Sequence, residues 1–97
     1  MPAYLIADIE VTDPEGYRGY AEEAPAVVAA HGGRYLARGG ATEVLEGSWE
    51  PDRLVILEFP DLAAARAFYE DPEYERIKPL RHDNARSRLL ITEGLTS

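Results

Sequence analysis

The order of extended and helical segments restricts the fold of this chain more than any other feature of its sequence. Residues 3–11, AYLIADIEV, alternate so that Leu5, Ala7 and Ile9 share one face, which predicts a strand. Residues 53–59, RLVILEF, are the most strand-like run, and residues 86–94 predict a last strand. Strands are therefore expected at both ends and in the middle, with helical segments between them.

The first helical segment follows the opening strand. Thr12 or Asp13 can cap it, Pro14 suits its first turn, and apolar residues then recur at helical spacing. Pro25 lies inside this pattern and predicts a bend, because proline removes one backbone hydrogen bond. The glycine pair at 32–33 is typical of the end of a helix.

The second helical region begins at Asp61, a typical N-cap. The residues that follow carry an apolar stripe at helical spacing: Leu62, Ala65, Phe68 and Tyr69. Asp71–Pro72 interrupts the region, and Pro79 is expected to limit how far the helix continues. This region is therefore predicted as one helix followed by another short turn or two.

The stretch GGRYLARGG, residues 32–40, invites comparison with a phosphate-binding loop, but it lacks the required context. A Walker loop needs a lysine and a hydroxyl residue after its glycines, and a dinucleotide fingerprint needs the strand before the helix. RYLAR, residues 34–38, instead predicts a strand with Arg34 and Arg38 on one face and Tyr35 on the other. Residues 41–49 predict a further extended segment that forms a hairpin with residues 53–59, with Gly39–Gly40 as a bulge in its first arm.

Taken together, the order strand, helix, strand, strand, helix, strand predicts a ferredoxin-like βαββαβ fold of the α+β class. Its antiparallel four-stranded sheet would carry both helices on one face. The whole chain, residues 1–97, is expected to form a single domain. Several apolar side chains would remain on the open face: Tyr4, Ile6, Leu54, Ile56 and Leu90. A second copy packed sheet to sheet would cover them, so a homodimer is predicted.

Composition and charge exclude several classes of partner. The formal net charge is −8, from 18 acidic and 10 basic side chains, which opposes binding to nucleic acid or to an anionic membrane surface. Cysteine is absent, which rules out thiolate catalysis and cysteine-ligated metals. The sequence has neither a signal-peptide pattern nor an apolar run long enough to span a membrane. A cytoplasmic location is expected.

Three long motifs carry a resemblance to a known family. The run GGRYLARGG, then LEGSWEPDRLVILEFPDLAAARAFYEDPEY, then IKPLR resembles the domain of unknown function 1330 family, a branch of the dimeric α/β-barrel superfamily. The resemblance covers nearly the whole chain. It implies a ferredoxin-like protomer and a dimer whose two sheets face each other, but it implies no particular reaction.

Candidate catalytic residues are polar side chains on otherwise apolar strands. Glu58 follows four apolar residues, and an enclosed carboxylate there would have a raised pKa and could act as a general acid or base. Asp8 is a second candidate for moving a proton. Arg38 either ends its strand in solvent or an ion pair, or points into a pocket where it stabilises an enolate or carboxylate. Glu58 has the alternative role of ion-pair partner for Arg38 or Arg53.

Candidate substrate-binding residues are Arg81, Tyr20, Tyr69 and Glu46. Arg81 lies in IKPLR and matches the family pattern, while most tyrosines are expected to belong to the core, with one or two lining a pocket. No metal-ligand spacing occurs, neither histidine suits a haem ligand, and no cofactor is predicted. Two functions therefore remain open. One is a cofactor-independent enzyme for a small organic acid, lactone or polyketide-like carbonyl compound, and the other is a non-catalytic ligand-binding or structural homodimer.

Overall fold

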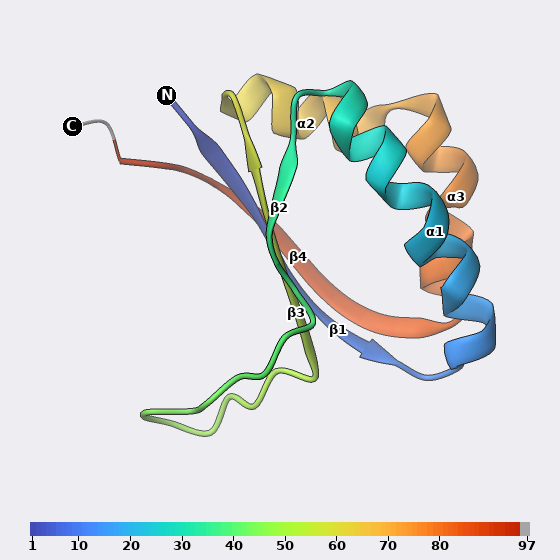
Figure 1. The fold of residues 1–97 in the computed structure, drawn as a ribbon, viewed down its shortest axis with the longest axis vertical. Helices are drawn as coiled ribbons and strands as arrows, with labels where there is room; N and C mark the ends of the chain where they lie inside the picture. Colours follow the sequence, from blue (N-terminus) through green and yellow to red (C-terminus); the bar gives the residue numbers. More distant parts are fainter. Residues whose placement is uncertain (96–97) are drawn as a thin grey trace.

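The computed structural model describes residues 1–95, in which four strands and three helices follow one another in the order β1, α1, β2, β3, α2, α3, β4. The strands are β1 (Ala3–Val11), β2 (Arg34–Arg38), β3 (Arg53–Phe59) and β4 (Ala85–Glu93). The helices are α1 (Pro14–Ala30), α2 (Leu62–Glu70) and α3 (Pro72–His82). The strands form one antiparallel sheet in the order β2-β3-β1-β4, and the helices cover one of its faces (Figure 1). This is the predicted ferredoxin-like arrangement, with the second helical region divided in two.

The core lies between the sheet and the helices. Alternate residues of β1 are buried there, as its sequence predicts: Ala3, Leu5, Ala7 and Ile9. Above them a row of aromatic rings crosses the helix layer, with ring centres 5.3 Å apart between Phe59 and Phe68 and 4.5 Å apart between Phe68 and Tyr74. Tyr20 of α1 extends the row, 6.1 Å from Tyr74. Such aromatic contacts stabilise a core beyond the area that they bury.

Side-chain caps set where each helix begins. The Asp13 carboxylate accepts the N–H groups of Glu15 and Gly16, and the Asp61 carboxylate accepts that of Ala64. α1 continues through Pro25 and ends before Gly32, whose φ of 74° suits a glycine. The expectation that Pro79 limits the last helix is wrong, because α3 runs on to His82. Pro79 lies on the exposed side of α3, where water can satisfy the carbonyl that loses its hydrogen bond.

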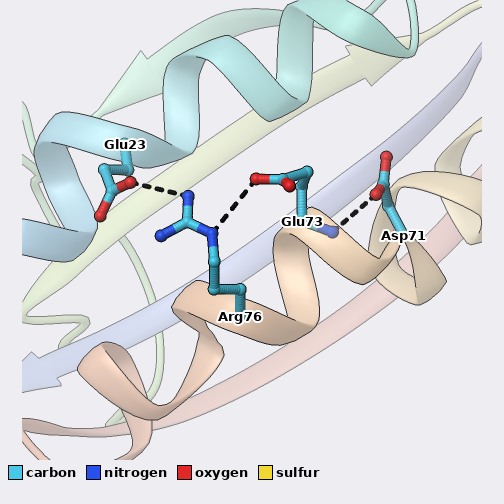
Figure 2. A network of polar contacts seen from close by, with 4 residues as sticks. All are labelled: Glu23, Asp71, Glu73 and Arg76. Atoms are coloured by element: carbon cyan, nitrogen blue, oxygen red, sulfur yellow. Dashed lines mark hydrogen bonds and ion pairs between the residues drawn. The ribbon is translucent and has the colours of Figure 1, made fainter.

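Asp71 and Arg76 join the helices to one another. Asp71 caps α3 by accepting the N–H of Glu73 at 2.7 Å, and it also accepts a 2.6 Å hydrogen bond from His31 at the end of α1. Figure 2 shows Arg76 of α3 between two carboxylates, with Nη2 2.8 Å from Glu23 of α1 and Nε 3.2 Å from Glu73. These contacts fix α1 against α3 over the sheet.

The connection between β2 and β3 differs from the prediction. β2 pairs directly with β3, and residues 39–52 form an exposed loop that extends away from the sheet (Figure 1). The predicted hairpin between residues 41–49 and 53–59 is therefore wrong. The physical reason is that β3 has only two edges, which β1 and β2 already occupy. The bulge is also misplaced in the prediction, because the pairing shifts at Leu36 and not at Gly39–Gly40.

Candidate functional site

The bulge at Leu36 determines which way Arg38 points. Tyr35 pairs with Leu57 and Arg38 pairs with Val55, so one extra residue separates two consecutive core-facing positions of β2. Leu57 and Val55 are both buried under the helices. Arg38 therefore lies on the same face as Tyr35, with its guanidinium carbon 4.7 Å from the centre of the Tyr35 ring. The predicted sharing of a face by Arg34 and Arg38 is wrong for this reason.

Arg38 lies at the edge of a pocket of about 300 Å³ between α1 and the helix-covered face of the sheet. Aliphatic side chains of β1 and β3 form its floor, and α1 forms one wall. Its lining combines four tyrosines, three arginines and one carboxylate: Tyr17, Tyr20, Tyr35, Tyr74, Arg18, Arg38, Arg53 and Glu22. An apolar hollow with a few convergent polar groups is typical of a small-molecule site.

Arg53 brings a second guanidinium to the pocket beside Arg38. It opens β3 opposite Ile9, on the core-facing side of the sheet, and its guanidinium carbon lies 5.7 Å from the centre of the Tyr17 ring. Gly39 makes room for it: a Cβ there would lie 2.6 Å from Arg53 Nη1, and the φ of 72° suits only glycine well. Within residues 1–95, neither Arg38 nor Arg53 forms an ion pair, and the buried Arg53 Nε has no acceptor.

Burial holds three of the pocket tyrosines, Tyr17, Tyr20 and Tyr35, in their neutral form. Burial raises the pKa of Tyr20 far above its usual range, and the neighbouring Tyr74 hydroxyl, 2.7 Å away, adds to this effect. Burial also raises the pKa of Tyr17 and of Tyr35, although the adjacent Arg53 and Arg38 guanidiniums act in the opposite direction. Neutral phenols beside arginines supply hydrogen-bond donors that suit an oxygen carrying negative charge.

The predicted carboxylates Asp8 and Glu58 lie on the opposite, open face of the sheet. Asp8 Oδ2 accepts hydrogen bonds from the Trp49 indole at 2.8 Å and from Arg88 Nη2 at 2.9 Å. These two donors lower the pKa of Asp8, so this carboxylate is a weak base here. Glu58 accepts a 2.7 Å hydrogen bond from Arg34 Nε, so its ion-pair partner is neither Arg38 nor Arg53. The structure does not bring either carboxylate together with Arg38.

The remaining candidates are distributed over three places. Tyr20 lines the same pocket as Arg38, whereas Arg81 and Tyr69 line a second cavity between α2, α3 and β4. Glu46 lies exposed in the loop of residues 39–52. Sequence reasoning missed Arg53 and Glu22 as pocket residues. Arg53 lies at the start of a strand and Glu22 lies on a helix, and neither position gives a signal that would single the residue out.

The arrangement can bind an anionic or enolisable group without a metal ion. Two unpaired arginines can hold a carboxylate or an enolate oxygen, while tyrosine rings enclose the rest of a planar molecule. Glu22, which is exposed, is the only carboxylate of residues 1–95 in the pocket lining. No three acidic or histidine side chains of residues 1–95 converge as metal ligands, and no helix there is long and apolar enough to cross a bilayer.

Comparison with protein families matches residues 2–95 to the family described as a domain of unknown function (DUF1330). The chain belongs to this family. The match confirms the resemblance to this family that the sequence motifs indicate. Because the function of the family is unknown, membership assigns no reaction to the chain. None of the curated proteins compared with the chain matches it.

Solved structures show that the DUF1330 chain shares its fold with dimeric ferredoxin-like proteins. A protein of unknown function from Rhodopseudomonas palustris is 24% identical with a TM-score of 0.74, over 99% of this chain and 84% of that one. SnoaB, a cofactor-independent oxygenase from Streptomyces nogalater, is 11% identical with a TM-score of 0.63, over 99% and 95% of the two chains. A dimeric ferredoxin-like protein of unknown function from Jannaschia sp. is 19% identical with a TM-score of 0.63, over 97% and 100%.

Proposed function

We propose that the protein is a cytoplasmic homodimer that binds a small organic acid, lactone or polyketide-like carbonyl compound in the tyrosine-lined pocket and catalyses proton transfer on it without a cofactor. The observation that carries this proposal is the pair Arg38 and Arg53, which point to one hollow without a carboxylate partner within residues 1–95. Guanidiniums that lack a protein counterion favour a ligand that brings the negative charge.

The pocket chemistry supports an enolate-type reaction. Loss of a proton next to a carbonyl places negative charge on its oxygen, which Arg38 and Arg53 would stabilise. Tyr17 and Tyr35, whose pKa values are raised by burial, stay protonated and can donate to the same oxygen. Glu22, which lines the pocket, would accept the proton. SnoaB, which shares the fold, is described as a cofactor-independent oxygenase, and this supports the class of chemistry by analogy alone.

The test is a calorimetric and thermal-shift screen of small carboxylates, lactones and phenolic ketones. The wild type should be compared with Arg38→Met and Arg53→Met, with Arg34→Met as the matched control, because Arg34 lies on the same strand but pairs with Glu58 on the open face. One lost charge-assisted contact of about 1.5–3 kcal/mol weakens binding about 10- to 100-fold. Equal affinity in all four proteins would refute the pocket assignment.

Turnover separates the two functions that remain open. Any ligand found in the screen should be incubated with the enzyme in deuterium oxide, where proton transfer next to the carbonyl introduces deuterium that mass spectrometry detects. Exchange that depends on Glu22 supports the enzyme. Tight binding with no exchange in the wild type would favour the non-catalytic ligand-binding homodimer, for which the exposed position of the only pocket carboxylate of residues 1–95 is the supporting observation.

The open face of the sheet supports the homodimer. Tyr4, Ile6, Leu54 and Ile56 remain partly exposed there, and Leu90 is 57% exposed. An apolar sheet face of this kind is stable in water when a partner covers it. The Jannaschia protein is described as dimeric, which supports the same assembly here. Ile56→Asp should give a monomer in sedimentation analysis, whereas a monomeric wild type would refute the proposal.

A further inference from the structure

Arg81 carries a buried charge that no carboxylate of residues 1–95 balances. It lies in the last turn of α3 and is only 2% exposed, which is unusual for an arginine. None of the ion pairs within residues 1–95 includes it. Because a guanidinium stays protonated even when buried, its neighbours have to compensate for the water that it loses.

The side chains that contact Arg81 within residues 1–95 include no carboxylate partner and leave its Nε without an acceptor. Nη1 donates to Ser87 Oγ, and the guanidinium carbon lies 5.8 Å from the centre of the Tyr20 ring. Nη2 lies 3.4 Å from His82 Nε2, at the limit of a hydrogen bond, and Nε has no acceptor. Nε and Nη2 form one edge of the guanidinium, and this edge is the one that binds a carboxylate side-on.

Arg81 also borders a cavity with the composition of an anion site. The cavity has a volume of about 290 Å³ and is lined by Tyr69, Arg81, His82, Ala85, Ser87 and Leu89. Its polar groups are a guanidinium, an imidazole and two hydroxyls, with no carboxylate among them. Only Leu89 also lines the pocket of Arg38 and Arg53, so the two cavities are separate sites.

We infer that this cavity is a second anion-binding site, in which Arg81 and Ser87 take a small oxyanion such as a carboxylate or phosphate group. Arg81 Nε is buried, but His82 is exposed, so its ring can move away from Nη2 and open a path for the incoming oxyanion to the Nε–Nη2 edge. The ligand supplies the negative charge that the protein does not place next to Arg81 within residues 1–95. This inference is independent of the proposed function of the pocket of Arg38 and Arg53.

The test is NMR observation of the arginine Nε–H groups while acetate or inorganic phosphate replaces chloride at constant ionic strength. The Arg81 Nε–H signal, assigned by its absence in Arg81→Gln, should move in a saturable way with at least one of the two probes. The probe that saturates at the lower concentration identifies the preferred group. The same shift should occur in Arg38→Met, because the pocket of Arg38 and Arg53 is not involved. A signal that does not move with either probe would overturn the inference.

Two further variants keep the test decisive if Arg81→Gln does not fold. Ser87→Ala removes the hydroxyl that holds Arg81 and should weaken anion binding about three- to tenfold. Arg86→Gln is the matched control, because it removes one positive charge from the position of β4 next to Ser87. Arg86 pairs there with Glu10 at 3.0 Å. This control variant should leave binding unchanged. Weakening by Arg86→Gln with no effect of Ser87→Ala would mean that only the overall charge matters, which contradicts a built site.

Discussion

The hydrogen bond between Tyr20 and Tyr74 provides a direct test of how the pocket wall is held together. The two hydroxyl oxygens lie 2.7 Å apart, and they join α1 to α3 next to the pocket. Tyr74 is fully buried and Tyr20 is partly buried. The perturbation is a double-mutant cycle of Tyr20→Phe, Tyr74→Phe and the variant that carries both changes.

The expected magnitude follows from which hydroxyl loses its partner. Each single change leaves one buried hydroxyl without this hydrogen bond, which costs about 1–3 kcal/mol of unfolding free energy. The double variant leaves neither hydroxyl, so its cost should be close to that of a single change. The cost of the double variant should therefore be smaller than the sum of the two single costs by at least about 1 kcal/mol. In a domain of this size, about 1 kcal/mol lowers Tm by roughly 4–8 °C.

Urea unfolding followed by far-ultraviolet circular dichroism measures these differences, with the slope against urea expected to stay unchanged. Tyr69→Phe is the control, because Tyr69 is exposed and makes no side-chain hydrogen bond of this kind within residues 1–95. Costs that add within about 0.5 kcal/mol would refute the reasoning. The two hydroxyls would then act independently, for example each on the nearby Arg81.

Three further predictions concern pH and the loop glycine. Burial raises the pKa of Tyr17 and Tyr35 above the usual value of 10.0, so their contribution to stability is complete below pH 10 and is lost as pH rises. The Tyr17 and Tyr35 phenols should then ionise together with unfolding and not before it, and the part of the 295 nm absorbance change that is lost in Tyr17→Phe and Tyr35→Phe measures this. The His31 hydrogen bond lowers the pKa of Asp71 below 3.8, so Asp71→Asn should destabilise the protein at pH 7 but have little effect near pH 2, as urea midpoints would reveal. Gly39→Ala should cost about 1 kcal/mol because of its positive φ, and it should also weaken ligand binding by displacing Arg53; unchanged affinity would argue against a role for Arg53.

Most of the fold could be predicted from the sequence because burial on one face leaves a periodic pattern. Buried and partly exposed residues alternate along most of β1, and Asp13 and Asp61 mark the helix starts by their chemistry. The segment 41–49 was misassigned because extended, partly apolar sequences look like strands whether or not a partner edge is free. The effect of Pro79 on helix length was mispredicted because the free-energy cost of a proline inside a helix depends on which side of α3 faces water. That side depends on how α3 packs.

The pocket was less predictable because a cavity depends on contacts between distant segments. Tyr20 and Tyr74 lie 54 positions apart, and only the packing of α1 on α3 brings their hydroxyls together. Arg53 follows a turn in the sequence, where an arginine normally lies in solvent. The expectation that Asp8 and Glu58 could act with Arg38 assumed one shared cavity, but the sheet itself separates these carboxylates from the pocket.

The extra residue at the Leu36 bulge determines which side chain of β2 lies on the open face and which enters the pocket. In a regular strand the alternation of RYLAR would place Arg38 on the open face, opposite Leu54. An unpaired arginine there would be costly once a second sheet packed against it. The extra residue instead places Ala37 opposite Ile56 and turns Arg38 toward the tyrosines. A small side chain on the face proposed for the dimer and a cation in the proposed ligand pocket thus have the same structural origin.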